Sequence, residues 1–187
     1  MARLVLASAS PRRWELLTQA GFSFTVHPAH IDEDVHAGED PVAYVTRLAR
    51  EKAEAVFGAL GDADTVVLGA DTTVTLDGQI LGKPEDAADA KRMLAALSGR
   101  THRVITGVAV VGAGRTEVAA EITAVRFQEI SAEEIAAYVA SGEPMDKAGA
   151  YGIQGLAAKW IPRIEGCYFN VVGLPLALVA TMLEGKA

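Results

Sequence analysis

Residues 4–17, LVLASASPRRWELL, join a strand to a helix within one short stretch. Leu4–Leu6 form the apolar run that is typical of a buried strand. Pro11 suits the first position of a helix, and apolar residues follow it at helical spacing as far as Leu17. The stretch therefore predicts a strand, a short turn and a helix, which is the repeating unit of an α/β fold.

The turn of this unit gathers hydrogen-bond donors. Ser8 and Ser10 precede the helix, and Arg12 and Arg13 occupy its first turn. With the backbone N–H groups of the helix start, these side chains suit several phosphate oxygens at once, which predicts a polyphosphate site. A purely structural alternative is equally good, because Ser-x-Ser-Pro is also an ordinary helix cap. Two cations oppose the helix dipole at this end, which favours a bound anion.

Composition limits the function classes. The chain has 187 residues, a net charge of -7 and one cysteine, Cys167, which we expect to be a buried small hydrophobe. Apolar runs are too short for a membrane span or a signal peptide, so we predict a cytoplasmic protein formed by a single domain, residues 1–187. An acidic chain argues against nucleic acid and for a small anionic ligand near the clustered arginines.

Residues 65–84, TVVLGADTTVTLDGQILGKP, contain the best single candidate for chemistry. The composition predicts a strand from Thr65 to Leu76, with Asp77-Gly78 as the turn of a hairpin. Alternation places Asp71 on the same face as Gly69 and Thr73, and the small Gly69 leaves room there for a ligand. A carboxylate inside a β-branched strand needs a metal, a cation or water.

Other charged candidates have weaker signals. Lys52 adjoins the apolar stripe of a helix that begins at Pro41, where an ordinary snorkelling lysine is the favoured interpretation. Lys83 sits in a rigid Gly-Lys-Pro turn, although turn lysines are most often plain surface charge. Glu33 belongs to the acidic stretch between His27 and Pro41, most of which we interpret as a solvated loop.

The remaining elements alternate between helical and strand periodicity. We expect a strand over 22–26, a helix over 85–97, a long hairpin over 101–111 and 116–127, a helix over 132–141, a strand near 159–164 and a last helix from 175. The glycine-rich segment 146–155 indicates a backbone that is approached closely, and its Gln154 suits a pyrimidine edge.

Five motifs together resemble the Maf family of nucleoside triphosphate pyrophosphatases: SASPRR at 8–13, ADT at 70–72, GKP at 82–84, DKAGAYGIQG at 146–155 and NVVGLPL at 170–176. The resemblance extends from about residue 4 to 183. Arg12, Thr72 and Gln154 match the branch that acts on dTTP and UTP. The 7-methyl-GTP branch is less similar, because its Trp directly follows the Pro, whereas here it is Trp14.

This resemblance implies hydrolysis between the α and β phosphates, with Mg²⁺ or Mn²⁺ as the cofactor. It implies a mixed, twisted α/β sheet flanked by helices, with two lobes, a central cleft and assembly as a homodimer. Asp71 would be the general base or a metal-associated carboxylate, and Glu33 a second metal ligand. The other implied contacts are to substrate and involve Ser8, Ser10, Arg12, Arg13, Lys52, Thr72, Lys83 and Gln154.

Two other function classes remain open from the sequence. A non-enzymatic nucleotide-binding regulator of cell division or septum formation would share the anion site without the chemistry. A phosphotransferase would normally carry a P-loop, and the sequence contains none.

Overall fold

A computed structural model describes residues 2–186. The described chain divides into two compact units. The first comprises residues 2–72, 106–121 and 173–186, and the second comprises residues 73–105 and 122–172. Three long strands contribute residues to both units. The single domain stays a prediction.

Within residues 2–186, seven strands form one mixed sheet in the order β2-β1-β3-β5-β6-β7, with β4 paired to β3. β1 pairs in parallel with β2 and β3, whereas the pairs β3–β4 and β6–β7 are antiparallel. This confirms the predicted α/β fold with a mixed sheet. The strands are β1 (Arg3–Leu6), β2 (Thr25–Val26), β3 (Thr65–Leu76), β4 (Gln79–Leu81), β5 (Thr101–Gly112), β6 (Arg115–Arg126) and β7 (Arg163–Glu165).

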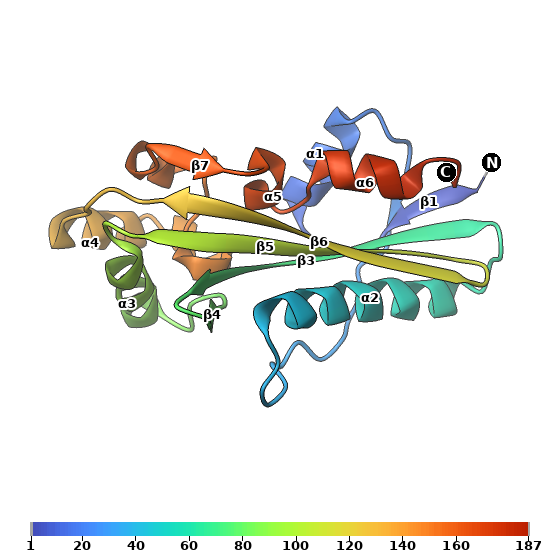
Figure 1. Ribbon diagram of the computed structural model, residues 1–187, viewed down its shortest axis with the longest axis horizontal. Coiled ribbons are helices and arrows are strands. Elements are labelled where there is room, and N and C mark those ends of the chain that lie inside the picture. The colour runs from blue at the N-terminus through green and yellow to red at the C-terminus, as the bar shows by residue number, and fades with distance from the viewer. Residues whose placement is uncertain (1, 187) are drawn as a thin grey trace. The chain divides into compact units, whose positions relative to one another are not determined.

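Three helices belong to the first unit: α1 (Pro11–Gln19), α2 (Pro41–Leu60) and α6 (Leu176–Leu183). There α2 lies along one face of the sheet, while α1 and α6 cover the other face (Figure 1). The apolar stripe of α2 is buried against the sheet because its inward residues, such as Val45 and Ala49, are fully enclosed.

Two strand glycines bring α2 close to the sheet. A Cβ atom on Gly69 would lie 2.2 Å from the backbone oxygen of Ala49, and one on Gly107 would lie 2.3 Å from the oxygen of Val45. The prediction that Gly69 leaves room for a ligand is therefore wrong. The helix backbone fills that space.

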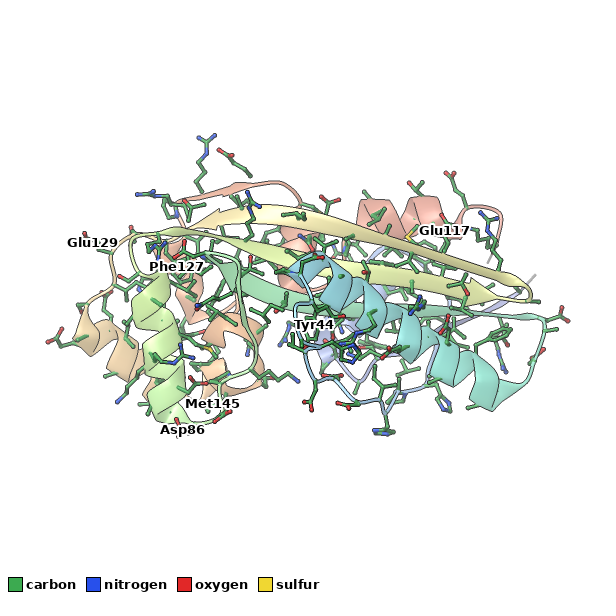
Figure 2. The ribbon with its side chains drawn as sticks, turned by 60° about the horizontal axis from the view of Figure 1, so that its bottom comes forward. Tyr44, Asp86, Glu117, Phe127, Glu129 and Met145 are labelled. Carbon is green, nitrogen blue, oxygen red and sulfur yellow. The ribbon has the colours of Figure 1, made fainter. Side chains whose placement is uncertain are left out.

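The second unit contains α3 (Ala87–Leu97), α4 (Ala132–Ala140), three short 3-10 turns (Glu143–Asp146, Ala148–Ala150 and Leu156–Trp160) and α5 (Tyr168–Val172). Its core is rich in aromatic residues that meet edge to face. Phe127, labelled in Figure 2 just after β6, packs on His102, Tyr151 and Trp160.

Several boundaries differ from the predictions. Residues 22–24 are not strand, since the N–H of Phe22 bonds to Leu17 O and continues the turn that ends α1. The predicted strand near 159–164 is displaced to β7, because residues 156–160 form a 3-10 turn with the indole of Trp160 buried. α5 was not predicted. Cys167 is only partly buried, which corrects the expectation of a buried thiol.

The other elements follow their predictions closely. The long hairpin of β5 and β6 is confirmed, as is the capping box of α4, in which Ser131 and Glu134 bond reciprocally. α3 begins two residues later than expected, at Ala87, since Asp86 caps it. No helix in the described range is both long and apolar enough to cross a membrane.

The buried side chain of His102 should make the stability of the second unit sensitive to acid. Its ring is 1% exposed, and Nε2 lies 2.6 Å from the hydroxyl of Tyr151, while Nδ1 has no hydrogen-bond partner within residues 2–186. Burial lowers the pKa of His102 to about 4. As pH falls below 6.5, the unfolded chain takes up a proton that the folded chain refuses, so we expect a loss of about 2 kcal/mol of stability by pH 5.

Denaturant unfolding of the wild type and of His102→Gln at pH 7.5 and pH 5 measures this loss. The glutamine keeps a polar group for Tyr151 but does not titrate, so the variant should lose less stability on acidification. An equal loss in both proteins would show that other groups cause it.

Candidate active site

Asp71 and Lys52 form a buried ion pair in the first unit. Asp71 lies within β3, and Lys52 reaches it from α2 with Nζ 2.7 Å from Oδ1. The residues are 9% and 7% exposed. The predicted need of Asp71 for a counter-ion is met by this amine. The interpretation of Lys52 as a snorkelling lysine is wrong, because its amine is turned inward to two carboxylates.

Glu33 completes this group of charges. Its Oε1 lies 2.8 Å from the same Nζ of Lys52, and its side chain is about half exposed. Burial raises the pKa of Asp71 above its ordinary value, although the charges of Lys52 and Arg13 oppose that change. A carboxylate of raised pKa, next to an exposed one, is suited to accept a proton.

Arg13 ties three segments of the first unit together. Its Nε donates to Gly173 O at 2.8 Å, Nη2 to Thr72 Oγ1 at 3.0 Å and Nη1 to Ser8 Oγ at 3.4 Å. Thr72 also bonds to Thr106 Oγ1 at 2.8 Å. Burial lowers the pKa of the Arg13 guanidinium, while Asp71 opposes that shift, so both charges share one environment. An arginine nevertheless stays charged.

The start of α1 has the geometry of an ordinary cap. Ser10 accepts from the N–H of Arg13 at 3.5 Å, and Ser8 accepts from the N–H of Ser10 at 3.1 Å. The ordinary helix cap, which the sequence offers as the alternative to an anion site, is therefore present. Arg12 is partly exposed in the same turn and lies close enough to Arg13 to lower its pKa. Pro11 has no N–H, and the N–H of Trp14 bonds to Ser10 O at 3.2 Å, so an anion at this turn would depend mainly on the arginine side chains.

Lys83 and Gln154 belong to the second unit, and both are exposed. The segments that carry them are connected, because the N–H of Gly149 donates to Gly82 O at 3.1 Å. Glu143 holds the residue that follows the glycine-rich segment, by accepting from the Leu156 N–H at 3.1 Å. The roles implied for Lys83 and Gln154 stay predictions.

The carboxylates fit a divalent metal only in part. Within residues 2–186, no group of three or more His, Cys, Asp or Glu side chains is arranged to hold an ion. Asp71 and Glu33 do converge on the position of one amine. Two carboxylates are what Mg²⁺ uses in phosphate-processing sites, where phosphates and water supply the other oxygens. The point at which the two carboxylates meet is occupied by the amine of Lys52, and the metal stays a prediction.

Sequence reasoning missed the residues that hold the Glu33 loop, Tyr44 and Arg47 on α2. Tyr44 Oη donates to Glu33 O at 2.9 Å, and Arg47 forms a two-pronged ion pair with Glu39 at 2.6 and 2.9 Å. Glu39 is thus held in a largely buried ion pair, so the interpretation as a solvated loop is wrong for it. Asp40 caps α2 and stays exposed. The sequence feature that could have identified Arg47 is its place between Val45 and Leu48, which are both buried on the same helix.

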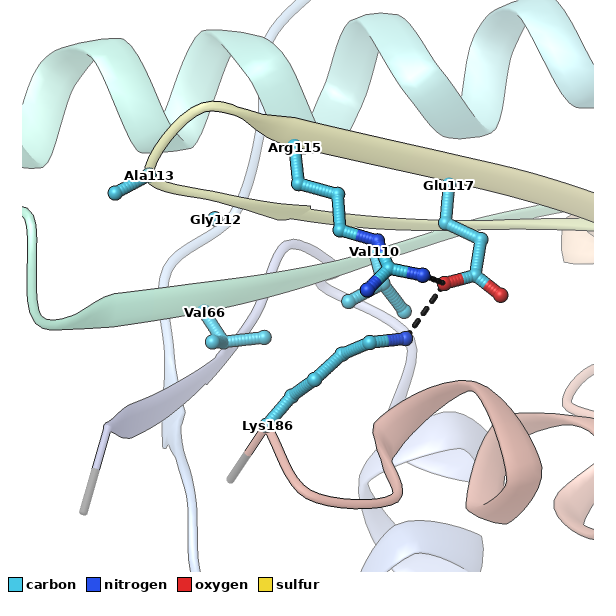
Figure 3. A pocket seen from close by; sticks show the side chains of 7 residues that line it. All are labelled: Val66, Val110, Gly112, Ala113, Arg115, Glu117 and Lys186. Atoms are coloured by element: carbon cyan, nitrogen blue, oxygen red, sulfur yellow. Dashed lines mark hydrogen bonds and ion pairs between the residues drawn. The ribbon is translucent and has the colours of Figure 1, made fainter.

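A cavity of about 200 Å³ lies elsewhere in the first unit (Figure 3). Val66 and Val110 contribute apolar surface, and Arg115 and Lys186 both point to Glu117. The single carboxylate of Glu117 is thus shared by two cations. None of the predicted site residues lines this cavity, so it is not the candidate active site.

Comparison with known proteins agrees with these motifs. A family model described as Maf-like protein matches residues 3–186. A dTTP/UTP pyrophosphatase of Koribacter versatilis is 56% identical over 181 residues, which cover 97% of this chain and 93% of the relative. A dTTP/UTP pyrophosphatase of Moorella thermoacetica is 57% identical over 185 residues, covering 98% and 94%.

Proposed function

The chain belongs to the Maf-like protein family, and on that premise we propose that it hydrolyses nucleoside triphosphates, dTTP and UTP above others, to the monophosphate and pyrophosphate. One observation carries the proposal most directly. The carboxylate of Asp71 is buried within a strand beside a buried lysine. Removing both charges from water costs desolvation free energy, and an apolar pair would fill the same place in the fold without that cost.

The chemistry assigns a part to each group. A water oxygen forms a bond to the phosphorus under attack while the bridging P–O bond breaks toward pyrophosphate. Asp71 takes the proton that the water loses, and its raised pKa suits that task. Lys52 holds Asp71 in place, and the cationic turn of Arg12 and Arg13, with the hydroxyls of Ser8 and Ser10, offsets charge on the phosphates.

A divalent cation, Mg²⁺ or Mn²⁺, would be held by Asp71 and Glu33 and would supply charge neutralisation and water polarisation. We assign Lys83 to the triphosphate and Gln154, Arg12 and Thr72 to the choice of base, by family resemblance. Assembly as a homodimer in the cytoplasm belongs to the same proposal. The proposal excludes nucleic acid as a partner, because the chain carries a net charge of -7.

A nucleotide panel tests this function. We expect the wild type with Mg²⁺ to release monophosphate and pyrophosphate in equal amounts, at least about tenfold faster from dTTP and UTP than from CTP and GTP. A difference of that size corresponds to about 1.4 kcal/mol in the transition state. Gln154→Ala should narrow this ratio, because the amide offers a donor and an acceptor to a base edge.

Gln79→Ala is the matched control, since Gln79 is an exposed glutamine of the same unit on β4. It should keep the wild-type ratio. Release of orthophosphate without pyrophosphate would contradict the proposed bond cleavage. Tight binding of nucleotide without turnover of any member of the panel would favour the non-enzymatic regulator.

A further inference from the structure

Helix α2 carries a second set of polar residues, one and two turns before Lys52. Tyr44 and Arg47 are three residues apart, so they share a face of the helix, and the guanidinium lies 5.8 Å from the ring centre of Tyr44. Figure 2 shows Tyr44 on the first part of α2. Both side chains are directed at the loop that precedes the helix and contains Glu33.

Arg47 contacts this loop at two places. Nε and Nη2 bond to the two carboxylate oxygens of Glu39 at 2.6 and 2.9 Å, and Nη2 also donates to Asp34 O at 2.9 Å. Glu39 in turn accepts from the N–H of His36 at 3.0 Å. The hydrogen bonds from Arg47 lower the pKa of Glu39 to about 2, so the pair stays charged at neutral pH.

Tyr44 contacts Glu33 itself. Its hydroxyl donates to the backbone oxygen of Glu33 at 2.9 Å, next to the Asp34 oxygen that Arg47 holds. Burial raises the pKa of Tyr44 to about 12, which keeps the hydroxyl protonated as a donor. Two consecutive peptide oxygens of an otherwise exposed loop are thus fixed by one helix.

We infer that Arg47 and Tyr44 are positioning residues, which fix the loop on α2 so that the carboxylate of Glu33 stays beside Lys52 and Asp71. The same helix then sets both the amine and the loop carboxylate that meets it at 2.8 Å. This inference rests on the proposed function, because it assigns Glu33 a part in catalysis or metal binding. Outer partners of this kind typically change metal affinity or activity by 10-fold to 100-fold when removed.

The test combines hydrogen exchange with kinetics. In Arg47→Ala, the N–H of His36 and its neighbours in residues 32–39 should exchange at least about tenfold faster, and the Mg²⁺ concentration for half-maximal turnover of dTTP should rise about tenfold. Arg47→Lys should show both effects to a smaller extent, since lysine keeps the charge but cannot form the bidentate contact with Glu39. Tyr44→Phe removes a single hydrogen bond and should give a smaller shift of both readouts in the same direction.

Arg50→Ala is the matched control. Arg50 is on the same helix and pairs at 3.9 Å with Glu54, both about half exposed, so its loss should leave exchange and kinetics unchanged. Glu33→Gln with Arg47→Ala completes a cycle. If Arg47 acts through Glu33, the second change adds little to the first.

Three results would overturn the inference: unchanged exchange in Arg47→Ala, faster exchange with unchanged kinetics, or an Arg47 effect that persists undiminished in Glu33→Gln. The exchange arm does not depend on catalysis. If the wild type hydrolysed no nucleotide, the proposed function would fail, and so would the catalytic part of the inference. Hydrogen exchange would still measure whether Arg47 and Tyr44 fix the loop on α2.

Discussion

Asp71→Asn is expected to lower kcat for dTTP by at least about a thousandfold while the protein stays folded, the range in which loss of a general base falls. The buried carboxylate is bonded to Lys52 at 2.7 Å, and an asparagine of the same shape still offers an oxygen to that amine. What it lacks is the capacity to take a proton and the negative charge opposite Arg13 and Lys52.

Steady-state kinetics with thermal unfolding measures both halves of this prediction. Asp64→Asn is a suitable control, because Asp64 precedes the same strand on the surface, and its change should leave kcat near the wild-type value. Activity of Asp71→Asn near that of the wild type would remove Asp71 from the mechanism. A variant that unfolds would instead indicate that the ion pair with Lys52 is mainly structural.

The pH profile gives an independent view of the same group. A raised pKa means that Asp71 keeps its proton to a higher pH than an ordinary aspartate does. In the proposed mechanism the carboxylate form of Asp71 accepts the proton from water, so activity should fall on acidification at a pH above the usual 3.8 of an aspartate. The acidic limb of kcat/KM for the free enzyme reports that ionisation.

Local sequence patterns were enough to predict most of the fold. The bounds of β3, the Asp77-Gly78 turn and the caps of α1 and α4 each follow from interactions within a few residues. Asp71 could be singled out for a similar reason, because a carboxylate conflicts with the strand composition around it. A local conflict of this kind indicates a buried partner but does not identify it.

The partners themselves depend on how distant segments approach. Nothing local distinguishes Lys52, which turns inward, from a lysine that reaches solvent, and the contact of Arg47 with Glu39 requires the loop to fold back on α2. The prediction for Gly69 is wrong for the same reason. Alternation correctly assigns Gly69 to its face of the strand. The backbone of α2 packs against that face, and it comes from a distant part of the chain.

Gly69→Ala is expected to destabilise the protein by about 3 kcal/mol or more, at the upper end of the cost of overpacking a core. The added methyl group would lie 2.2 Å from Ala49 O and 3.0 Å from the Cβ of Ala53, and a backbone oxygen has no rotamer by which to move away. The helix must therefore shift as a body. Denaturant unfolding of the variant and the wild type measures the loss.

Gly58→Ala provides the opposite case with the same chemical change. Gly58 lies within α2, nothing approaches within 4 Å of its added Cβ, and alanine favours a helix by up to about 1 kcal/mol, so this variant should be as stable as the wild type or more. If Gly69→Ala were equally harmless, α2 would not rest on β3 as described. Because α2 also carries Lys52, a displaced helix should lengthen the contact with Asp71, and Gly69→Ala should lose activity even under conditions in which it remains folded.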